Sequence, residues 1–543
     1  MGKGMAHSCR VALDPLTRIG AMNDNKPNPA KAAELYQQAL QAFQAQQSAG
    51  SETLARQALV QDPDHADSLE LLGAIYAARE ERAFSLPFFE RAVKLAPHMA
   101  QFHYNLGVIH HELNRFPQAM RSYHQALRLQ PEHNAALSNY GDLLRRHDQL
   151  EAAREHLERL LGLEPDAKGL PLKLALTYFG LKDYEKADER FVQALKDPKE
   201  PAVVHWEYAH YLLLKKRFAE GWASYEWRAE CSKFNSVYHF PHPQPRWNGE
   251  SLKGKTLLIH REQGLGDEIM FGSIIEEAIR DADRVVLVAA PEMVRLWQSS
   301  LPAKVHVYPY WGALPPGWDQ PGLPAWYKDY NFDYQIAIGR LAHLLRPTLE
   351  SFGSPRPYIR VADELVEEWK AKVDAIPNIA DKKKIGVMWG ANPAAFHYDA
   401  SRRALRKSVP LHELEPLAST APGMKGIQLV SLANSVHGSQ AGSLNALDLI
   451  DFSEDLIDLA ETAALMKNLD LIITIDTSLA HLAGAMGLKV WMPLCWDADW
   501  RWGEEDETSY WYQDVRLFRQ AKAGDWKPVV KQIARELKAF SKA

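Results

Sequence analysis

A glycine-rich turn that ends in a carboxylate lies near the middle of the chain, directly after the apolar run 256–259. Its residues are Gln263, Gly264, Leu265, Gly266 and Asp267. The turn lacks the third glycine of a dinucleotide fingerprint and the Gly-Lys-Ser/Thr of a P-loop, so neither NAD nor Walker-type ATP binding is indicated. Glycines at the end of a strand let a ligand approach closely. The carboxylate of Asp267 can cap the next helix or accept a proton from a hydroxyl nucleophile.

A second polar turn, Asp476-Thr477-Ser478, follows the apolar run 471–475. Thr477 and Ser478 can cap the helix that comes next, and the free N–H groups of its first turn can bind a phosphate. Capping without any ligand is the alternative. His481 lies in the same expected helix, where a lone histidine is more often a buried, hydrogen-bonded side chain than a catalyst.

A basic run provides four cations within six residues: Arg402, Arg403, Arg406 and Lys407. Such a run is often solvated surface. Because it lies in the same half of the chain as Asp476, it is also a candidate clamp for a diphosphate.

Two Asp-x-Asp pairs, Asp281 with Asp283 and Asp497 with Asp499, imitate a metal-binding motif. The first pair lies between an expected helix and an expected strand, and both pairs are typical of turns. No metal site is therefore predicted.

Aromatic residues gather at two places. Trp500 and Trp502 flank Arg501 after an expected strand, where they can stack on a base or a sugar or can simply pack in the core. The loop 308–330 holds seven aromatic residues among prolines and glycines. A long loop of this composition is an expected lid that faces an acceptor.

The elements that must position these residues differ between the two halves of the chain. In the first half, prolines recur every 34 residues, and small residues recur in the same frame. The recurring residues are Pro63, Pro97, Pro131 and Pro165; Gly73, Gly107 and Gly141; and Ala58, Ala92 and Ala126. Small residues let paired helices approach, and proline ends the second helix of each unit. This is the tetratricopeptide (TPR) pattern, and about six units predict a curved α solenoid with a concave groove for an extended peptide.

Two asparagines, Asn105 and Asn139, stand one period apart at a position expected to line the concave wall. A carboxamide there can donate to and accept from a peptide backbone, so both are predicted acceptor contacts. Leu71 and Lys173 interrupt the series on either side. The alternative is that each asparagine satisfies a neighbouring turn.

The second half of the chain alternates short aliphatic runs with helical stretches, which predicts parallel sheets with right-handed crossovers. A proline-rich stretch at 240–246 separates this half from the repeats. A charged stretch at 361–384 separates its strands into two groups. We expect two Rossmann-like domains facing one cleft. The expected order is a flexible N-terminus over 1–29, the solenoid over 30–235, a linker over 236–254, a Rossmann-like domain over 255–362, an interdomain linker over 363–383, and a second such domain with a terminal helix over 384–543.

The composition of the chain indicates which kinds of partner and which cellular compartment to expect. The 543 residues include 63 Lys and Arg against 69 Asp and Glu, a net charge of −6, so the chain offers no polycation for nucleic acid and no nucleic-acid partner is expected. Cys9, Cys231 and Cys495 match no zinc or disulfide spacing, which favours a reducing compartment. No stretch approaches about 18 uninterrupted apolar residues, and no secretory leader is visible. We therefore expect a cytoplasmic protein without a transmembrane segment.

Several motifs together resemble a known family. They are QGLGDEIMF, LDLIITIDTSLAHLAGAMG, DADWRW, SYWY and RLFRQAKAGDW. This combination resembles the glycosyltransferase domain found behind TPR repeats in many bacterial proteins. That domain is similar to the lipopolysaccharide heptosyltransferases, which have the GT-B fold. The general plan is also similar to that of the flagellin glycosyltransferases and the nucleocytoplasmic O-linked N-acetylglucosamine transferases.

The resemblance implies roles for the residues of the two turns and the basic run. Gly266-Asp267 matches the Gly-Asp of the heptosyltransferases, which implies that Asp267 is the general base. Asp476-Thr477-Ser478 matches their donor-phosphate turn Asp-Thr-Gly, with serine in place of glycine. Their phosphate-binding lysine matches Lys407, with Arg403 and Arg406 as rivals. The implied donor-binding residues are Gly264, Gly266, Arg403, Arg406, Lys407, Asp476, Thr477, Ser478 and His481, and Asn105 and Asn139 resemble the asparagine ladder of the nucleocytoplasmic transferases.

The implied function is inverting, metal-independent transfer of a sugar from a nucleotide-sugar donor to a hydroxyl of a protein held by the repeats, with flagellin a candidate acceptor and no cofactor required. One alternative is a non-catalytic adaptor whose glycosyltransferase domain has degenerated. Another is a transferase that acts on a lipid or polysaccharide, although a peptide groove is then hard to explain.

Overall fold

A computed structural model describes residues 27–196, 201–231, 243–310, 325–391, 398–433 and 447–542. The chain divides into two compact units, residues 1–197 and residues 198–543. Most of the expected flexible N-terminus, residues 1–26, lies outside the described residues.

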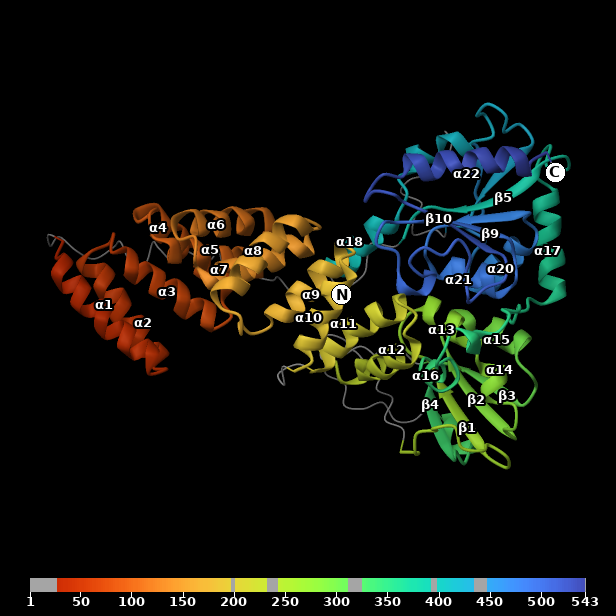
Figure 1. Ribbon diagram of the computed structural model, residues 1–543, viewed down its shortest axis with the longest axis horizontal. Helices are drawn as coiled ribbons and strands as arrows, with labels where there is room; N and C mark the ends of the chain where they lie inside the picture. Colours follow the sequence, from red (N-terminus) through yellow and green to blue (C-terminus); the bar gives the residue numbers. More distant parts are fainter. Residues whose placement is uncertain are drawn as a thin grey trace, which may run out of the picture. The chain divides into compact units, whose positions relative to one another are not determined.

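The first unit consists of helices in antiparallel pairs, as the proline spacing predicts (Figure 1). The helices are α1 (Pro29–Gln44), α2 (Ser48–Gln61), α3 (Ala66–Ala78), α4 (Arg82–Leu95), α5 (Ala100–Glu112), α6 (Phe116–Leu129), α7 (Asn134–Arg146), α8 (Leu150–Leu163), α9 (Leu170–Gly180) and α10 (Tyr184–Ala194). The small residues of the repeat act as expected, because a Cβ on Gly107 would lie 2.6 Å from the Tyr123 ring of the paired helix. The prediction of an N-terminal helical-repeat solenoid is confirmed.

The repeat period is also visible in the backbone. The turn inside each helix pair contains one non-glycine residue with a positive φ of about +60°, and these residues are spaced by 34. They are Gln46, Glu80, Asn114, Asp148, Lys182 and Lys216. The last of them lies in the second unit, so the first helix pair of that unit has the same turn geometry as the repeats of the first unit.

The second unit begins with this last helix pair, α11 (Pro201–Leu214) and α12 (Phe218–Tyr225), followed by a 3₁₀ turn, η1 (Glu226–Glu230). The expected solenoid range of 30–235 therefore includes a helix pair that packs with the sheets. The reason is that α11 is apolar over most of its surface, and it buries residues against α12, η1 and the turn η9 (Trp500–Trp502). Trp222 of α12 donates its indole N–H to the Arg346 carbonyl at 2.8 Å.

A first parallel sheet follows, with strand order β3-β2-β1-β4. Its strands are β1 (Thr256–His260), β2 (Arg284–Ala289), β3 (Val305–Pro309) and β4 (Tyr334–Ala337), and its helices are α13 (Leu265–Gly272), α14 (Ile275–Ala278), α15 (Val294–Ser300) and α16 (Arg340–Leu345). In register, Ile259 of β1 stands beside Leu287 and Ile336. We call residues 256–352 the first-sheet half.

A second parallel sheet has the order β10-β9-β8-β5-β6-β7. Its strands are β5 (Lys383–Met388), β6 (Ile427–Ser431), β7 (Leu449–Ile450), β8 (Leu471–Thr474), β9 (Val490–Leu494) and β10 (Val515–Arg519). The helices of this region are α17 (Asp363–Asp374), α18 (Tyr398–Lys407), α20 (Leu459–Lys467), α21 (Ser478–Ala485) and α22 (Lys527–Phe540). We call residues 383–540 the second-sheet half; parallel sheets in the C-terminal region are confirmed.

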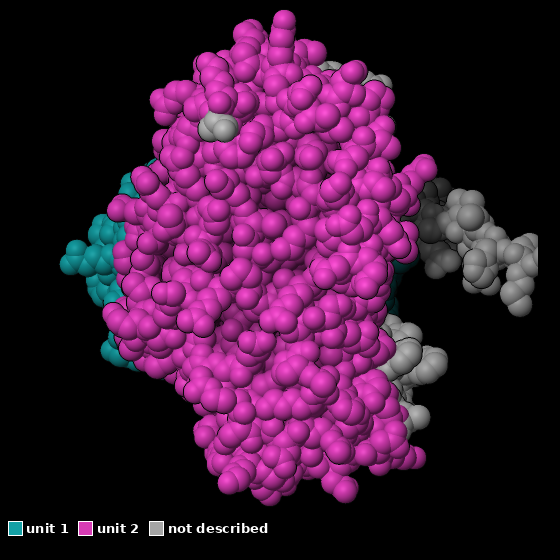
Figure 2. All heavy atoms as spheres, turned by 90° about the vertical axis from the view of Figure 1, so that its right-hand side faces the viewer, with its two compact units in different colours: residues 1–197 teal, residues 198–543 magenta. Residues whose placement is uncertain are grey.

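The connection between the two halves is more ordered than its charge pattern suggests. The expected interdomain linker over 363–383 contains the helix α17, which packs on α20 through the buried Trp369. Its charged residues occupy the outer face of that helix. The described residues of the second unit form one continuous body in the space-filling view (Figure 2).

The expected linker over 236–254 is described from residue 243 onward, and this part attaches to the first sheet. Trp247 is buried, and its backbone N–H donates to the Gln335 carbonyl of β4 at 2.9 Å.

None of the helices in the described ranges combines the length and the apolar character that crossing a membrane requires.

Candidate functional site

The two polar turns singled out in the sequence meet where α13 packs on α21. The residues 261–264 leave the carboxyl end of β1 and lead into α13, while Thr477 and Ser478 lead from β8 into α21. A Cβ on Gly266 would lie 2.9 Å from Cδ2 of His481 and 3.7 Å from the Cα of Ser478. Any larger residue would push the helices apart, so Gly266 allows the two turns, about 210 residues apart in the sequence, to come into contact.

Asp267 has partners for both carboxylate oxygens. Oδ2 accepts a hydrogen bond from the backbone N–H of Gly264 at 3.0 Å, which is the helix-capping geometry expected as the structural role. Oδ1 forms an ion pair with Nη2 of Arg501, which comes from the second-sheet half. The carboxylate therefore lies at the interface of the two halves and carries a charge partner from the opposite side.

Arg501 is the centre of this charge network. Its Nη1 lies 2.6 Å from Oδ1 of Asp499, and its guanidinium stacks on Trp500 at 4.4 Å. Burial alone would lower the pKa of Arg501, but Asp267 and Asp499 hold it well above its ordinary value. Arg501 is consequently a fixed positive charge shared by two carboxylates.

The flanking tryptophans pack in the core instead of lying open for a ligand. The residues Trp500 and Trp502 are 2% and 1% exposed. Of the two alternatives offered by the sequence, core packing is the one that the structure shows.

Lys407 reaches the second turn. Its Nζ forms an ion pair with Oδ2 of Asp476, and both side chains are largely buried. Burial would raise the pKa of Asp476, yet the Lys407 charge outweighs it and lowers that pKa. Burial likewise opposes the charge of Lys407, but Asp476 and Asp499 raise its pKa. The pair is therefore ionised on both sides.

The two rival candidates for the phosphate-binding cation, Arg403 and Arg406, lie farther out. Arg406 pairs with Asp497 at 2.8 Å on the surface. Arg403 is exposed, and its charge acts on Lys407 and Asp499. Lys407 is thus the member of the three candidates that contacts the Asp476 turn.

The first turn of α21 has no side-chain cap from its N-cap residue. Thr477 is the N-cap residue with φ −141° and ψ 175°, and its side chain accepts no hydrogen bond from the backbone N–H groups that begin this helix. The Thr477 hydroxyl is buried and has no hydrogen-bond partner among the described residues. Ser478 lies in the same turn. An uncapped helix start with an orphaned hydroxyl has the chemistry to bind an anion.

His481 lies behind this turn and is nearly fully buried. Its Nδ1 lies 2.8 Å from the hydroxyl of Tyr512, and its ring stacks on Trp502 with a centroid distance of 4.9 Å. Burial lowers the pKa of His481 to about 4, so the imidazole is neutral near pH 7. In this position it supports the packing of α21 on α13.

The Asp-x-Asp pairs have structural partners. Asp281 accepts hydrogen bonds from the Ser251 hydroxyl and the Leu252 backbone N–H, and Asp497 and Asp499 pair with Arg406 and Arg501. The described part of the chain contains no group of three or more metal-ligating side chains.

The predicted acceptor residues lie in the first unit and bond to the preceding repeat. Asn105 donates to Glu70 and accepts from Gln101, and Asn139 donates to the Tyr104 hydroxyl at 3.2 Å. Lys173, at the equivalent position of the next repeat, donates to Ser138 at 2.7 Å. The same position thus links successive repeats, with each bond spanning 35 residues.

The aromatic loop 308–330 is described only at its two ends, because residues 311–324 lie outside the described part. At those ends Tyr308 stacks on Trp326 with a centroid distance of 4.3 Å, against the buried Tyr327. Its expected role as a lid stays a prediction.

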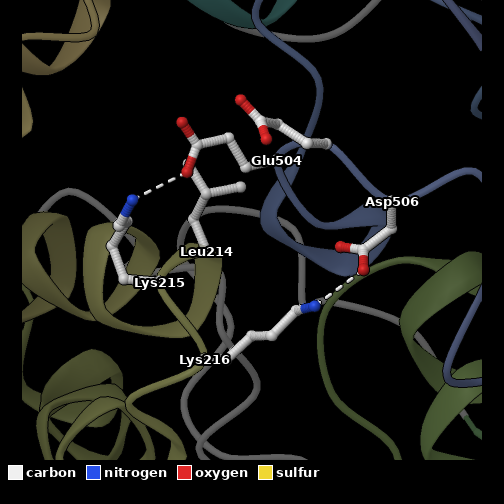
Figure 3. Close-up of a pocket in the computed structure, with 6 residues that line it drawn as sticks. Leu214, Lys215, Lys216, Glu504 and Asp506 are labelled. Atoms are coloured by element: carbon white, nitrogen blue, oxygen red, sulfur yellow. Dashed lines mark hydrogen bonds and ion pairs between the residues drawn. The ribbon is translucent and has the colours of Figure 1, made fainter.

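A hollow elsewhere in the second unit is lined by charged residues that follow α11 and by the segment after η9 (Figure 3). Lys215 pairs with Glu504, and Lys216 pairs with Asp506, each at 2.7 Å. These ion pairs connect the last helix pair to the second-sheet half. The residues that line the hollow include none of the predicted site residues.

Two parts of the site had little signal in the sequence. The Arg501 partnership with Asp267 spans 234 residues. The contacts that Tyr225 and Arg228 make with residues 262 and 263 join the last repeat to the first sheet. The sequence does place Trp222 and Trp227 beside Tyr225, but it does not show which distant residues this aromatic group contacts.

Comparisons with known proteins support the presence of the repeats, and one relative matches most of the chain. The tetratricopeptide repeat model matches residues 100–133, and the chain contains such repeats. Protein FlbA of Caulobacter vibrioides is 28% identical over 494 residues, which are 88% of this chain and 79% of FlbA. Protein O-mannosyl-transferase TMTC1 of Homo sapiens is 27% identical over 190 residues, which are 32% of this chain and only 21% of TMTC1.

Solved structures with similarity to the chain include those of YrrB and PilW. YrrB, a TPR protein with an unusual peptide-binding site, has 19% identity and a TM-score of 0.31, and the match covers 33% of this chain and 94% of YrrB. PilW, a type IV pilus biogenesis factor, has 20% identity and a TM-score of 0.33, with 38% and 95% covered.

Proposed function

We propose that the protein is a glycosyltransferase of the GT-B type that moves a sugar from a nucleotide-sugar donor to a hydroxyl of a protein acceptor. The observation that carries the proposal is the meeting of the two turns. Asp267 and the start of α21 belong to different halves and lie where α13 packs on α21, so closely that a Cβ on Gly266 would lie 3.7 Å from the Cα of Ser478. In parallel α/β folds, ligands bind at the carboxyl ends of strands, where both turns lie.

The chemistry assigns one task to each side of the interface. Asp267 accepts the proton of the acceptor hydroxyl while the hydroxyl oxygen attacks the anomeric carbon. The bond from that carbon to the donor phosphate breaks, and its electron pair stays on the phosphate oxygen. Lys407 and the N–H groups at the start of α21 stabilise this developing charge. Two fixed cations, Lys407 and Arg501, supply positive charge without a metal ion.

The repeats and the relatives support the protein acceptor. Helical-repeat solenoids present extended surfaces that bind peptides, and the chain contains such repeats. The name of TMTC1 refers to mannosyl transfer to protein, but only 21% of that relative is matched. It therefore supports a protein acceptor less strongly than the repeats do. Flagellin is the first acceptor to test.

A non-catalytic adaptor is the second candidate, because both oxygens of Asp267 are already engaged and Lys407 is paired with Asp476. In that case the charge network would only hold the two halves together. Donor turnover separates the two functions.

The test uses the purified full-length protein with a panel of nucleotide sugars, and it measures release of the nucleotide with and without an acceptor protein. Asp267→Asn should reduce transfer by about 10²-fold or more, on the scale of general-base catalysis. Asp281→Asn is the matched control, since Asp281 also caps a turn through Ser251 but lies away from the interface. Absence of turnover with every donor, or equal turnover in the two variants, would favour the adaptor.

A further inference from the structure

The segment that precedes Asp267 is held by the end of the last helix pair. Residues 261–263 connect β1 to the glycine turn, and two of their side chains bond to α12 and η1. The bonds join a helical repeat directly to the loop that precedes the proposed base.

Tyr225, the last residue of α12, binds Gln263. Its hydroxyl lies 3.0 Å from Oε1 and 2.6 Å from Nε2 of the Gln263 side chain. Gln263 has φ +58°, a left-handed conformation that residues with a Cβ rarely adopt. Such a conformation persists where surrounding contacts determine it, and the Tyr225 hydrogen bond is one of those contacts.

Arg228, in η1, binds the neighbouring residue Glu262 with two hydrogen bonds. Its Nε lies 2.8 Å from Oε2 and its Nη2 lies 2.6 Å from Oε1, and both side chains are 5% exposed. Glu262 Oε1 also accepts from the backbone N–H of Gly339, beyond β4. Two consecutive loop residues are therefore fixed by the same helical segment.

Tyr225 also contacts the opposite side of the interface. Its ring lies 6.3 Å from the ring of Trp500, and Trp500 carries the guanidinium of Arg501 on its face. Tyr225 thus lies between the loop that precedes Asp267 and the tryptophan that supports its partner Arg501. A small displacement of this ring would change the geometry on both sides of the ion pair.

We propose that Tyr225 is a positioning residue that holds Asp267 and Arg501 in register, so that the last helical repeat is part of the reaction site. The inference rests on the proposed function for the reaction itself, while the placement of the loop can be measured without it. Tyr225 acts through Gln263 and Trp500 and does not contact the substrate.

The experiment compares Tyr225→Phe with Tyr178→Phe in the full-length chain. Both variants remove one buried hydroxyl, because the Tyr178 hydroxyl donates to Glu158 at 2.7 Å inside the solenoid. In Tyr225→Phe, hydrogen–deuterium exchange over residues 261–268 should rise and kcat should fall by about 10- to 100-fold, since a small misplacement of a catalytic group has effects of this size. The donor KM should change by less than about twofold, because Lys407 and α21 are untouched. Tyr178→Phe should change neither the exchange over 261–268 nor kcat.

Two results would overturn the inference. The first is equal exchange over 261–268 in the wild type and Tyr225→Phe, whatever the rates. The second is increased exchange with an unchanged kcat, which would make the contact a packing detail of the loop. If the wild type turns over no donor, the proposed function fails, and the exchange result still decides whether Tyr225 holds the loop.

Discussion

Asp267 of the first-sheet half and Arg501 of the second-sheet half form an ion pair across the interface between two separate parallel sheets. The same guanidinium holds Asp499. Because the pair is largely buried, its geometry depends on the relative position of the two halves, and any opening of the interface must separate these charges.

Arg501→Met should destabilise the protein far more than Arg295→Met. Both arginines pair with two carboxylates and connect the two halves, but Arg295, bound to Asp458 and Glu461, is 48% exposed while Arg501 is 12% exposed. Removing Arg501 leaves two buried carboxylates without their partner, at a cost of about 3–5 kcal/mol in unfolding free energy. Loss of the exposed pair should cost no more than about 1 kcal/mol. Urea unfolding of the two variants measures the difference, and equal effects would mean that Arg501 is not a central contact.

Lys407→Ala should weaken binding of the nucleotide-sugar donor by about 1.5–3 kcal/mol, the range for a lost charged hydrogen bond. Ser478→Ala should weaken it by less, because a neutral hydroxyl is lost. Calorimetric titration measures both, with Arg406→Ala as the comparison, since Arg406 pairs with Asp497 on the surface. Unchanged affinity in the Lys407 and Ser478 variants would move the phosphate site, with Arg403 as the next residue to test.

The double change Asn105→Ala and Asn139→Ala should lower transfer to a full-length protein acceptor at subsaturating concentration and leave donor hydrolysis unchanged. The asparagines bond to Glu70 and Tyr104 of the preceding repeats, so their loss should also destabilise the first unit by about 1 kcal/mol per hydrogen bond. Thermal unfolding recorded beside the transfer rates separates the two effects. Equal transfer by the wild type and the double variant would exclude these side chains as acceptor contacts.

Stability should decrease as the pH falls from about 6.5 to about 4 through the titration of His481. Its pKa in the folded protein is about 4, below the ordinary 6.5, so the unfolded chain binds the proton more readily. The contribution of the neutral imidazole is therefore complete above pH 6.5 and is lost as the pH falls through this window, by about 3 kcal/mol at most. The pKa of Asp476 is lowered in the folded protein, so protonation of this carboxylate further reduces the stability below the pH at which an ordinary aspartate titrates.

The measurement is urea unfolding at several pH values for the wild type and His481→Gln. The difference in unfolding free energy between the two proteins should shrink as the pH approaches 4. If the difference in unfolding free energy between the two proteins stays constant from pH 6.5 to pH 4, burial does not lower the pKa of His481.

Local patterns were enough to predict most of the elements. The 34-residue spacing predicts the helix pairs because it reflects contacts within one pair, such as Gly107 against Tyr123. The apolar runs predict the parallel strands because both faces of such a sheet are buried. The glycines of the first turn are expected to let a ligand approach closely, which stays a prediction; the side chain that lies against Gly266 in the structure is His481.

The sequence by itself determined the repeats, the two groups of strands and the two polar turns, since each depends on residues that are close along the chain. The tertiary structure alone decided which of Arg403, Arg406 and Lys407 reaches Asp476, and that Trp500 and Trp502 are buried. It also decided that Arg501 pairs with Asp267 and that the last helix pair joins the sheets. These relationships are contacts between distant segments, and burial and charge pairing select them only when the whole unit is folded.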